Sequence, residues 1–232
     1  MTMLSAAQLL QRFDVFGRYR EVELGGKVWS MRSHLEIMAT ELKADPTQRD
    51  GPADLVAVMM NPGGSRPLCE LDAQGWAPAL PDRTQYQLMR LAQAGQQHGL
   101  KIRHIRVINL SDLRTPKSAE LMRALTELAP LGVRGSIHSI FGACRRNELA
   151  AALGPTDVPV LRAWGLGRWL APLARQAVAA TAGAPTLGLS ADGLHYRHPL
   201  PQRFDLQRAW LAEATAQWLA LKAVLRDPQT VL

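Results

Sequence analysis

Residues with the chemistry to bind or react follow directly after apolar runs of the chain. The first group, Asn61-Pro62-Gly63-Gly64, closes the apolar run 55–60. Its glycines would let a ligand approach the backbone closely, and consecutive backbone N–H groups could bind an anion. The Asn61 carboxamide could hold a water molecule or the polar edge of a ligand. Since asparagine, proline and glycine are common turn residues, an ordinary turn is the alternative.

A second asparagine, Asn109, stands where the apolar run 102–110 ends. Its side chain could face a cleft, or it could bond to the backbone of its own loop. Asp112 and Arg114 follow in the same loop, where they could form a structural ion pair.

Two later segments carry aromatic and basic residues. Trp164 stands near the end of the run 158–165, where core packing is the alternative to stacking on a ligand. His198 lies in a loop without a carboxylate beside it in sequence, so we expect its imidazole to be neutral near pH 7. His195 and His198 have the spacing of a metal-binding pair, but no matching third ligand is found, so no metal is predicted.

The elements that must position these residues alternate regularly after residue 50. Apolar runs predict strands, and amphipathic segments between them predict helices, which together favour an open, mainly parallel sheet. The predicted strands are 55–60, 102–110, 136–141, 158–165 and 185–190, and the predicted helices are 83–99, 118–129, 144–153, 167–183 and 203–225. Ligands of such sheets bind at the carboxyl ends of the strands, where the polar residues described above stand.

The first fifty residues lack this alternation. They predict a helix over 4–13, a short edge strand over 28–31 and a helix over 34–45 that ends before a proline. We therefore expect residues 1–50 to be a helical and edge extension packed on a single α/β domain of residues 51–232.

The composition and net charge of the chain limit the classes of function that it can have. The 232 residues are 47% hydrophobic and 20% charged, which excludes a disordered, fibrous or disulfide-stapled protein. Neither an apolar run of about 18 residues nor a signal-peptide pattern is present, which predicts a cytoplasmic protein. The net charge of +7 points to a polyanion partner or to compositional bias. P-loop, dinucleotide-binding, nucleophile-elbow and HExxH motifs are absent from the sequence.

The segments MMNPGGSRP, PDRTQYQLMRLAQ, RVINLSDLRTP, HSIF, VLRAWG and HPLPQ, in this order, resemble a bacterial family known as domain of unknown function 1643. The pattern of that family runs LNPS, D-PT, VVNLF-LR, AWG and HPL, and the likeness spans Leu55 to Pro201. More loosely, the same segments resemble the uracil-DNA glycosylase superfamily, whose strand ends carry GINPG-type, asparagine, WG and HPS-type motifs.

The second resemblance implies a three-layer α/β/α fold with a short, mainly parallel sheet and a glycosylase-like hydrolase of modified or deaminated bases in DNA. No cofactor is implied, and DNA is the expected partner. The implied catalytic residues are Asn61 and His198, the implied substrate-binding residues are Pro62, Gly63, Gly64, Asn109, Trp164 and Leu200, and the implied contacts to the nucleic-acid backbone are Arg66, Arg197 and Arg203.

Two departures from the superfamily pattern keep other functions open. Asn61 replaces the aspartate of the most active branch, so it could orient a water molecule but not deprotonate one. The HPLPQ segment lacks the serine of the HPS motif. The alternatives are a non-catalytic module that binds nucleic acid or a nucleotide, in genome maintenance or phage defence, and an enzyme of free nucleosides or nucleotides.

Overall fold

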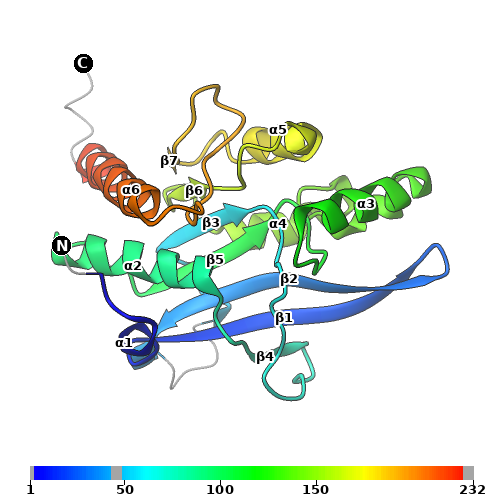
Figure 1. Cartoon of the computed structure of the whole chain (residues 1–232), viewed down its shortest axis with the longest axis horizontal. Helices are drawn as coiled ribbons and strands as arrows, with labels where there is room; N and C mark the ends of the chain where they lie inside the picture. The colour runs from blue at the N-terminus through cyan, green and yellow to red at the C-terminus, as the bar shows by residue number, and fades with distance from the viewer. Residues whose placement is uncertain (1–2, 43–48, 227–232) are drawn as a thin grey trace.

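The computed structural model describes residues 3–42 and 49–226, and Figure 1 shows its helices and strands. Seven strands form one sheet in the order β4-β1-β2-β5-β3-β6-β7. The strands are β1 (Phe13–Leu24), β2 (Lys27–Ala39), β3 (Leu55–Met59), β4 (Trp76–Pro78), β5 (His104–Asn109), β6 (Val160–Arg162) and β7 (Thr186–Leu187). The helices are α1 (Ala6–Leu10), α2 (Arg83–Gln97), α3 (Ser118–Leu128), α4 (Arg146–Leu153), α5 (Ala171–Ala180) and α6 (Phe204–Arg226).

The predicted α/β class is confirmed, but the sheet is mixed rather than mainly parallel. Strands β5, β3, β6 and β7 are parallel to one another. Strands β4, β1 and β2 pair antiparallel, and β2 joins the two halves by pairing antiparallel with β5. The residues before position 40 therefore contribute two long strands to the same sheet as the later ones.

The helix predicted over 34–45 is wrong, because residues 34–39 belong to β2. His34, Leu35, Glu36 and Ile37 alternate polar and apolar side chains with the period of two that a strand requires. Thr40–Leu42 form a short 3-10 helix, and residues 43–45 lie outside the described residues. The edge strand predicted over 28–31 is the beginning of β2, and the first predicted helix is limited to α1.

The strand predicted over 136–141 is also wrong. Gly135–His138 form a 3-10 helix, and the loop after it leads toward α4. Ile140 and Phe141 are nevertheless buried in the core beside Val56 and Val58. The segment is apolar because it fills the core, and not because it pairs in the sheet. The other strands and helices predicted after residue 50 are found, most of them shorter by a few residues.

A buried ionic triad fixes how β2 pairs with β5. Glu36 lies opposite Arg106 in the register, and Arg106 Nε donates a hydrogen bond of 2.8 Å to Glu36 Oε1. His104 Nε2 lies 2.6 Å from Glu36 Oε2, and the three side chains are almost completely buried. Since separating buried charges from their partners is strongly destabilising, a shifted register would be costly.

A β-bulge in the β1–β2 pair changes which residues face each side of the sheet. Arg18 lies opposite His34, but Tyr19 lies opposite Arg32, so Ser33 is an extra residue on β2. Because successive side chains of a strand alternate, one extra residue exchanges the two faces. Arg32 is thereby placed on the face that Leu35 also occupies further along the strand.

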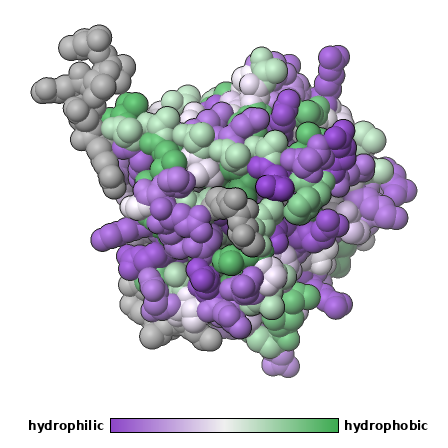
Figure 2. All heavy atoms as spheres, turned by 60° about the vertical axis from the view of Figure 1, so that its left-hand side comes forward, coloured by the Kyte–Doolittle hydropathy of each residue, from purple (hydrophilic) through white to green (hydrophobic). Residues whose placement is uncertain are grey.

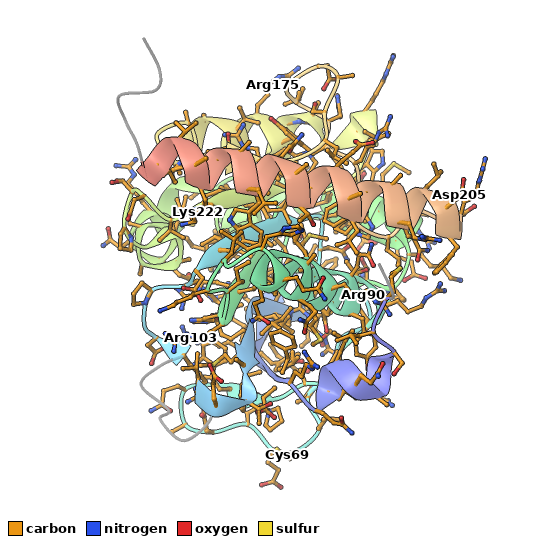
Figure 3. The ribbon with its side chains drawn as sticks, turned by 90° about the vertical axis from the view of Figure 1, so that its left-hand side faces the viewer. Cys69, Arg90, Arg103, Arg175, Asp205 and Lys222 are labelled. Atoms are coloured by element: carbon orange, nitrogen blue, oxygen red, sulfur yellow. The ribbon has the colours of Figure 1, made fainter. Side chains whose placement is uncertain are left out.

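Helices cover both faces of the central strands (Figure 1). Leu55, Ala57 and Met59 of β3 pack with residues of α2 and α6, whereas Val56 and Val58 pack with residues of α4 and α5. Figure 3 shows α6 and α2 side by side in front of the sheet, and Figure 2 shows polar side chains over most of the neighbouring face with smaller apolar patches. The helices thus turn their apolar stripes toward the sheet.

The chain leaves β3 and β5 in opposite directions. β3 leads to α2 on one face, and β5 leads to α3, whose Leu121 and Leu128 pack with Met31 and Leu113. In open α/β sheets such a switch of direction leaves a crevice at the carboxyl ends of the two strands. The ends of β3 and β5 are therefore the place in this fold where a crevice is expected.

We predict that residues 51–232 do not fold without residues 1–50. Removing them would leave one edge of β5 unpaired over residues 104–107 and would expose the core residues that pack against Leu35 and Ile37. Circular dichroism and thermal melting of the two chains would check this. The full chain should melt cooperatively and the shortened chain should not, and a cooperative melt of the shortened chain would contradict the prediction.

Candidate functional site

A pocket of about 260 Å³ lies at the carboxyl ends of β3 and β5. Asn61, Asn109 and His198, which stand far apart in the sequence, line it together. The remaining lining residues come from β2, β3, β5, the first half of α2 and the adjoining loops: Arg32, Met59, Met60, Pro62, Gly63, Gly64, Asp82, Thr84, Gln85, Leu88, Val107 and Pro116.

Asn109 is the last residue of β5 and is fully buried. It lies on the same face of the strand as Val107, toward α2. Neither its Oδ1 nor its Nδ2 has a hydrogen-bond partner among the described residues. The carboxamide is therefore not used to fix its own loop. Because buried polar atoms are nearly always paired, the side chain offers one donor group and one acceptor to a ligand of the pocket.

Arg32 is a second buried polar side chain of the pocket, and the sequence analysis did not identify it. It is 2% exposed, and its Nε and Nη1 have no partner among the described residues. Burial lowers the pKa of Arg32 to about 10, so the guanidinium keeps its charge at neutral pH. The alternation of polar and apolar residues in β2 indicates a strand. The bulge that turns Arg32 toward the pocket has no comparable pattern in the sequence.

Asn61 connects the loops that follow β3 and β5. Its Nδ2 donates to the carbonyl oxygens of Leu113 and Thr115, at 3.3 Å and 2.8 Å, and lies 3.0 Å from Thr115 Oγ1. The amide nitrogen is thus committed to the protein, and a ligand contact of Asn61 would use Oδ1. Gly63 has a φ of 62°, which disfavours residues with a side chain and explains the glycine of this turn.

His198 reaches the pocket from the loop before α6 and is half-buried. Its Nδ1 accepts a hydrogen bond of 3.2 Å from the backbone N–H of Leu200. Burial lowers the pKa of His198, which favours the neutral imidazole. A neutral imidazole whose Nδ1 accepts a hydrogen bond carries its proton on Nε2, so His198 can donate a hydrogen bond from that atom.

Asp82 adds a carboxylate that was not among the predicted site residues, although it belongs to the PDRTQ segment. It caps α2, since its Oδ1 accepts from the backbone N–H groups of Thr84 and Gln85 at 2.8 Å and 2.9 Å. Its Oδ2 lies 3.9 Å from the position that a Cβ atom on Gly63 would take. The pocket therefore contains a carboxylate near the loop that carries Asn61.

Several residues singled out from the sequence do not line this pocket. Trp164 is 1% exposed, and its Nε1 donates to the carbonyl oxygen of Leu194, so it packs in the core. Leu200, Arg66 and Arg197 are not among the lining residues. Arg203 is exposed and pairs with Asp205 at 2.6 Å.

The remaining polar residues of the predicted loops have other partners. His195 Nδ1 lies 2.6 Å from Asp192 Oδ2, and His195 is not among the residues that line the pocket with His198. Asp112 pairs with Arg145 on the other side of the loop, and not with Arg114. Arg114 Nε donates to the carbonyl oxygen of Ser65 instead.

Two negative findings concern only residues 3–42 and 49–226. His, Cys, Asp and Glu side chains do not gather there in any group of three that could hold a metal ion. None of the helices in these ranges has the length and apolar content to span a membrane. Comparison of the chain with protein-family models, curated proteins and solved structures finds no match.

We predict opposite effects on stability for the two asparagines. Asn109→Leu should leave the free energy of unfolding unchanged or raise it, because it removes unpaired buried polar atoms. Asn61→Leu should lower the free energy of unfolding by about 1–3 kcal/mol, because the carbonyl oxygens of Leu113 and Thr115 lose the hydrogen bonds from Asn61. Urea unfolding of both variants and the wild type would measure this. A clear loss of stability in Asn109→Leu would indicate a structural role for Asn109.

Proposed function

We propose that the pocket binds a nucleobase and that the protein is a glycosylase-like hydrolase, which cleaves the N-glycosidic bond of a modified or deaminated base. The observation that carries this proposal is the fully buried Asn109 carboxamide, whose two polar atoms have no partner among the described residues. One donor beside one acceptor is the complement of the amide or imide edge of a base.

The size and place of the pocket support the same class of ligand. A volume of about 260 Å³ is below the roughly 300–1,000 Å³ of sites for drug-sized molecules, which suits one ring system better than a dinucleotide. Helices on both faces of the central strands and polar loops at their carboxyl ends are what a three-layer, uracil-DNA glycosylase-like fold would have. We include that fold in the proposal.

The proposed reaction has a group of the pocket for each requirement. A water oxygen forms a bond to the sugar carbon, the C–N bond breaks, and its electron pair leaves with the base as an anion. His198 Nε2–H and the Arg32 guanidinium would stabilise the charge that develops on the base. Asn61 Oδ1 would hold the water molecule, and the Asp82 carboxylate would accept its proton.

A module that binds a nucleotide without catalysing a reaction is the second candidate, and the positions of the arginines weaken the case for DNA as the ligand of either candidate. Arg66, Arg197 and Arg203 do not line the pocket, and Asp205 already pairs with Arg203. The proposal of DNA as the partner therefore rests on the net charge of +7 and on the motif resemblance, whereas the pocket itself suits a free base or nucleotide equally well.

We predict that base release depends on Asn109. The protein would be incubated with oligonucleotides that carry uracil, hypoxanthine or hypermodified pyrimidines, and abasic sites would be revealed by alkaline cleavage. Asn109→Ala should lower the rate at least about tenfold, because one lost contact to a base edge is worth about 1–3 kcal/mol. Asn147→Ala, on the exposed side of α4, is the matched control and should react like the wild type. Binding without cleavage by the wild type would favour the second candidate.

Asp82→Asn would separate the capping role of Asp82 from its proposed role as a base. Asparagine caps helices as well as aspartate does, so the variant should melt within a few degrees of the wild type. It should release base at least about 100-fold more slowly, because a carboxamide cannot accept the proton from water. Asp82→Ala should lose both stability and activity. An Asp82→Asn variant with wild-type rates would limit Asp82 to the helix cap.

A further inference from the structure

Arg32 differs from the other buried arginines of the described chain. Arg106 is paired with Glu36, and Arg145 is paired with Asp112 and Glu148. Arg162 donates to Thr181 and to the Tyr196 hydroxyl. Only Arg32 among these four combines almost complete burial with two guanidinium nitrogens, Nε and Nη1, that have no hydrogen-bond partner.

The acidic residues near Arg32 form no hydrogen bonds with its Nε and Nη1. Asp82 lines the same pocket, but its Oδ1 caps α2, and Arg32 Nε and Nη1 form no hydrogen bond to it. Asp112 pairs with Arg145 and lies 3.6 Å from Arg20. A buried cation with two unpaired N–H groups is unfavourable in the folded protein. A ligand that carries negative charge would remove this penalty when it binds.

We propose that Arg32 makes the pocket selective for an acidic heterocycle, in which a negatively charged oxygen meets Arg32 and a ring N–H with its neighbouring carbonyl meets Asn109. This inference rests on the proposed base-binding pocket and names the class of its ligand. The guanidinium binds the charged oxygen through charge-assisted hydrogen bonds, which are stronger than those between neutral groups.

The donor and acceptor of Asn109 distinguish this ligand from a simple oxyanion. A fully ionised phosphate or carboxylate offers only acceptors, and would leave Asn109 Oδ1 without a donor. A ring N–H beside a carbonyl satisfies both atoms of the carboxamide. The Asp82 carboxylate in the pocket wall also disfavours a small, highly charged anion.

Calorimetric titration of the full chain with four probes tests the proposal. The probes are uracil, uracil-6-carboxylate, barbiturate, which is an anion at neutral pH, and inorganic phosphate. We expect the two anionic pyrimidines to bind at least about tenfold more tightly than uracil, as charge-assisted hydrogen bonds imply. Phosphate should bind more weakly than either.

Variants assign the selectivity to Arg32. Arg32→Gln should abolish the advantage of the anionic pyrimidines over uracil, and Arg32→Lys should retain part of it, since lysine keeps the charge but not the planar fork. Asn109→Ala should weaken all three pyrimidines alike. Arg123→Gln, on the exposed side of α3, is the matched control for charge.

A melting measurement shows whether these variants are folded. Arg32→Met should melt at the same temperature as the wild type or higher, because it removes a buried charge whose Nε and Nη1 are unpaired among the described residues. A large loss of stability in Arg32→Met would overturn the proposal by assigning Arg32 to the structure.

The outcomes of the titration separate this inference from the proposed function. If uracil binds as tightly as the anionic pyrimidines, or if Arg32→Gln keeps their advantage, the proposal of an acidic ligand is wrong. The proposal that the pocket binds a base would not be affected. If phosphate binds most tightly, or if no pyrimidine binds, the proposal of an acidic heterocycle as the ligand is also wrong. Whether the protein cleaves a glycosidic bond is decided separately by the release of base from oligonucleotides.

Discussion

The antiparallel pairing of β2 with β5 is the interaction on which the rest of the structure depends. It joins the antiparallel N-terminal strands to the parallel half of the sheet, and Glu36, Arg106 and His104 fix its register from within. A buried ion pair is weak support for stability in general, because desolvation offsets much of the attraction. Here its effect is specificity, since a shift by one residue would turn Glu36 away from both of its partners.

The geometry of the pocket follows from this register. With Glu36 opposite Arg106, the preceding bulge brings Arg32 beside the end of β5, where Asn109 stands. Asn61 then ties the loop after β3 to the loop after β5 through its amide nitrogen. The sheet thus determines the positions of Arg32 and Asn109, whereas Asp82 comes from the start of α2 and His198 from a loop far along the chain.

The sequence predicted the parallel half of the sheet from strong periodic patterns, and six of its predicted site residues line the pocket: Asn61, Pro62, Gly63, Gly64, Asn109 and His198. Asn61 and Asn109 follow buried apolar runs, and the carboxyl ends of neighbouring parallel strands meet at one edge of the sheet. Arg32 could not be predicted in this way, because its direction depends on one extra residue in a strand. The strand expected over 136–141 failed for a different reason, since an apolar segment can fill a core without pairing.

The positions of the charged residues change the interpretation of the net charge of +7. The exposed arginines expected to contact nucleic acid lie outside the pocket, and one of them is paired with a neighbouring carboxylate. The arginine with the strongest need for a negative partner is instead buried within the fold. Net charge sums over many solvated side chains, each of which contributes little because water already stabilises it. A single cation removed from water, with Nε and Nη1 unpaired among the described residues, favours a negatively charged partner more strongly than any one of these surface charges does.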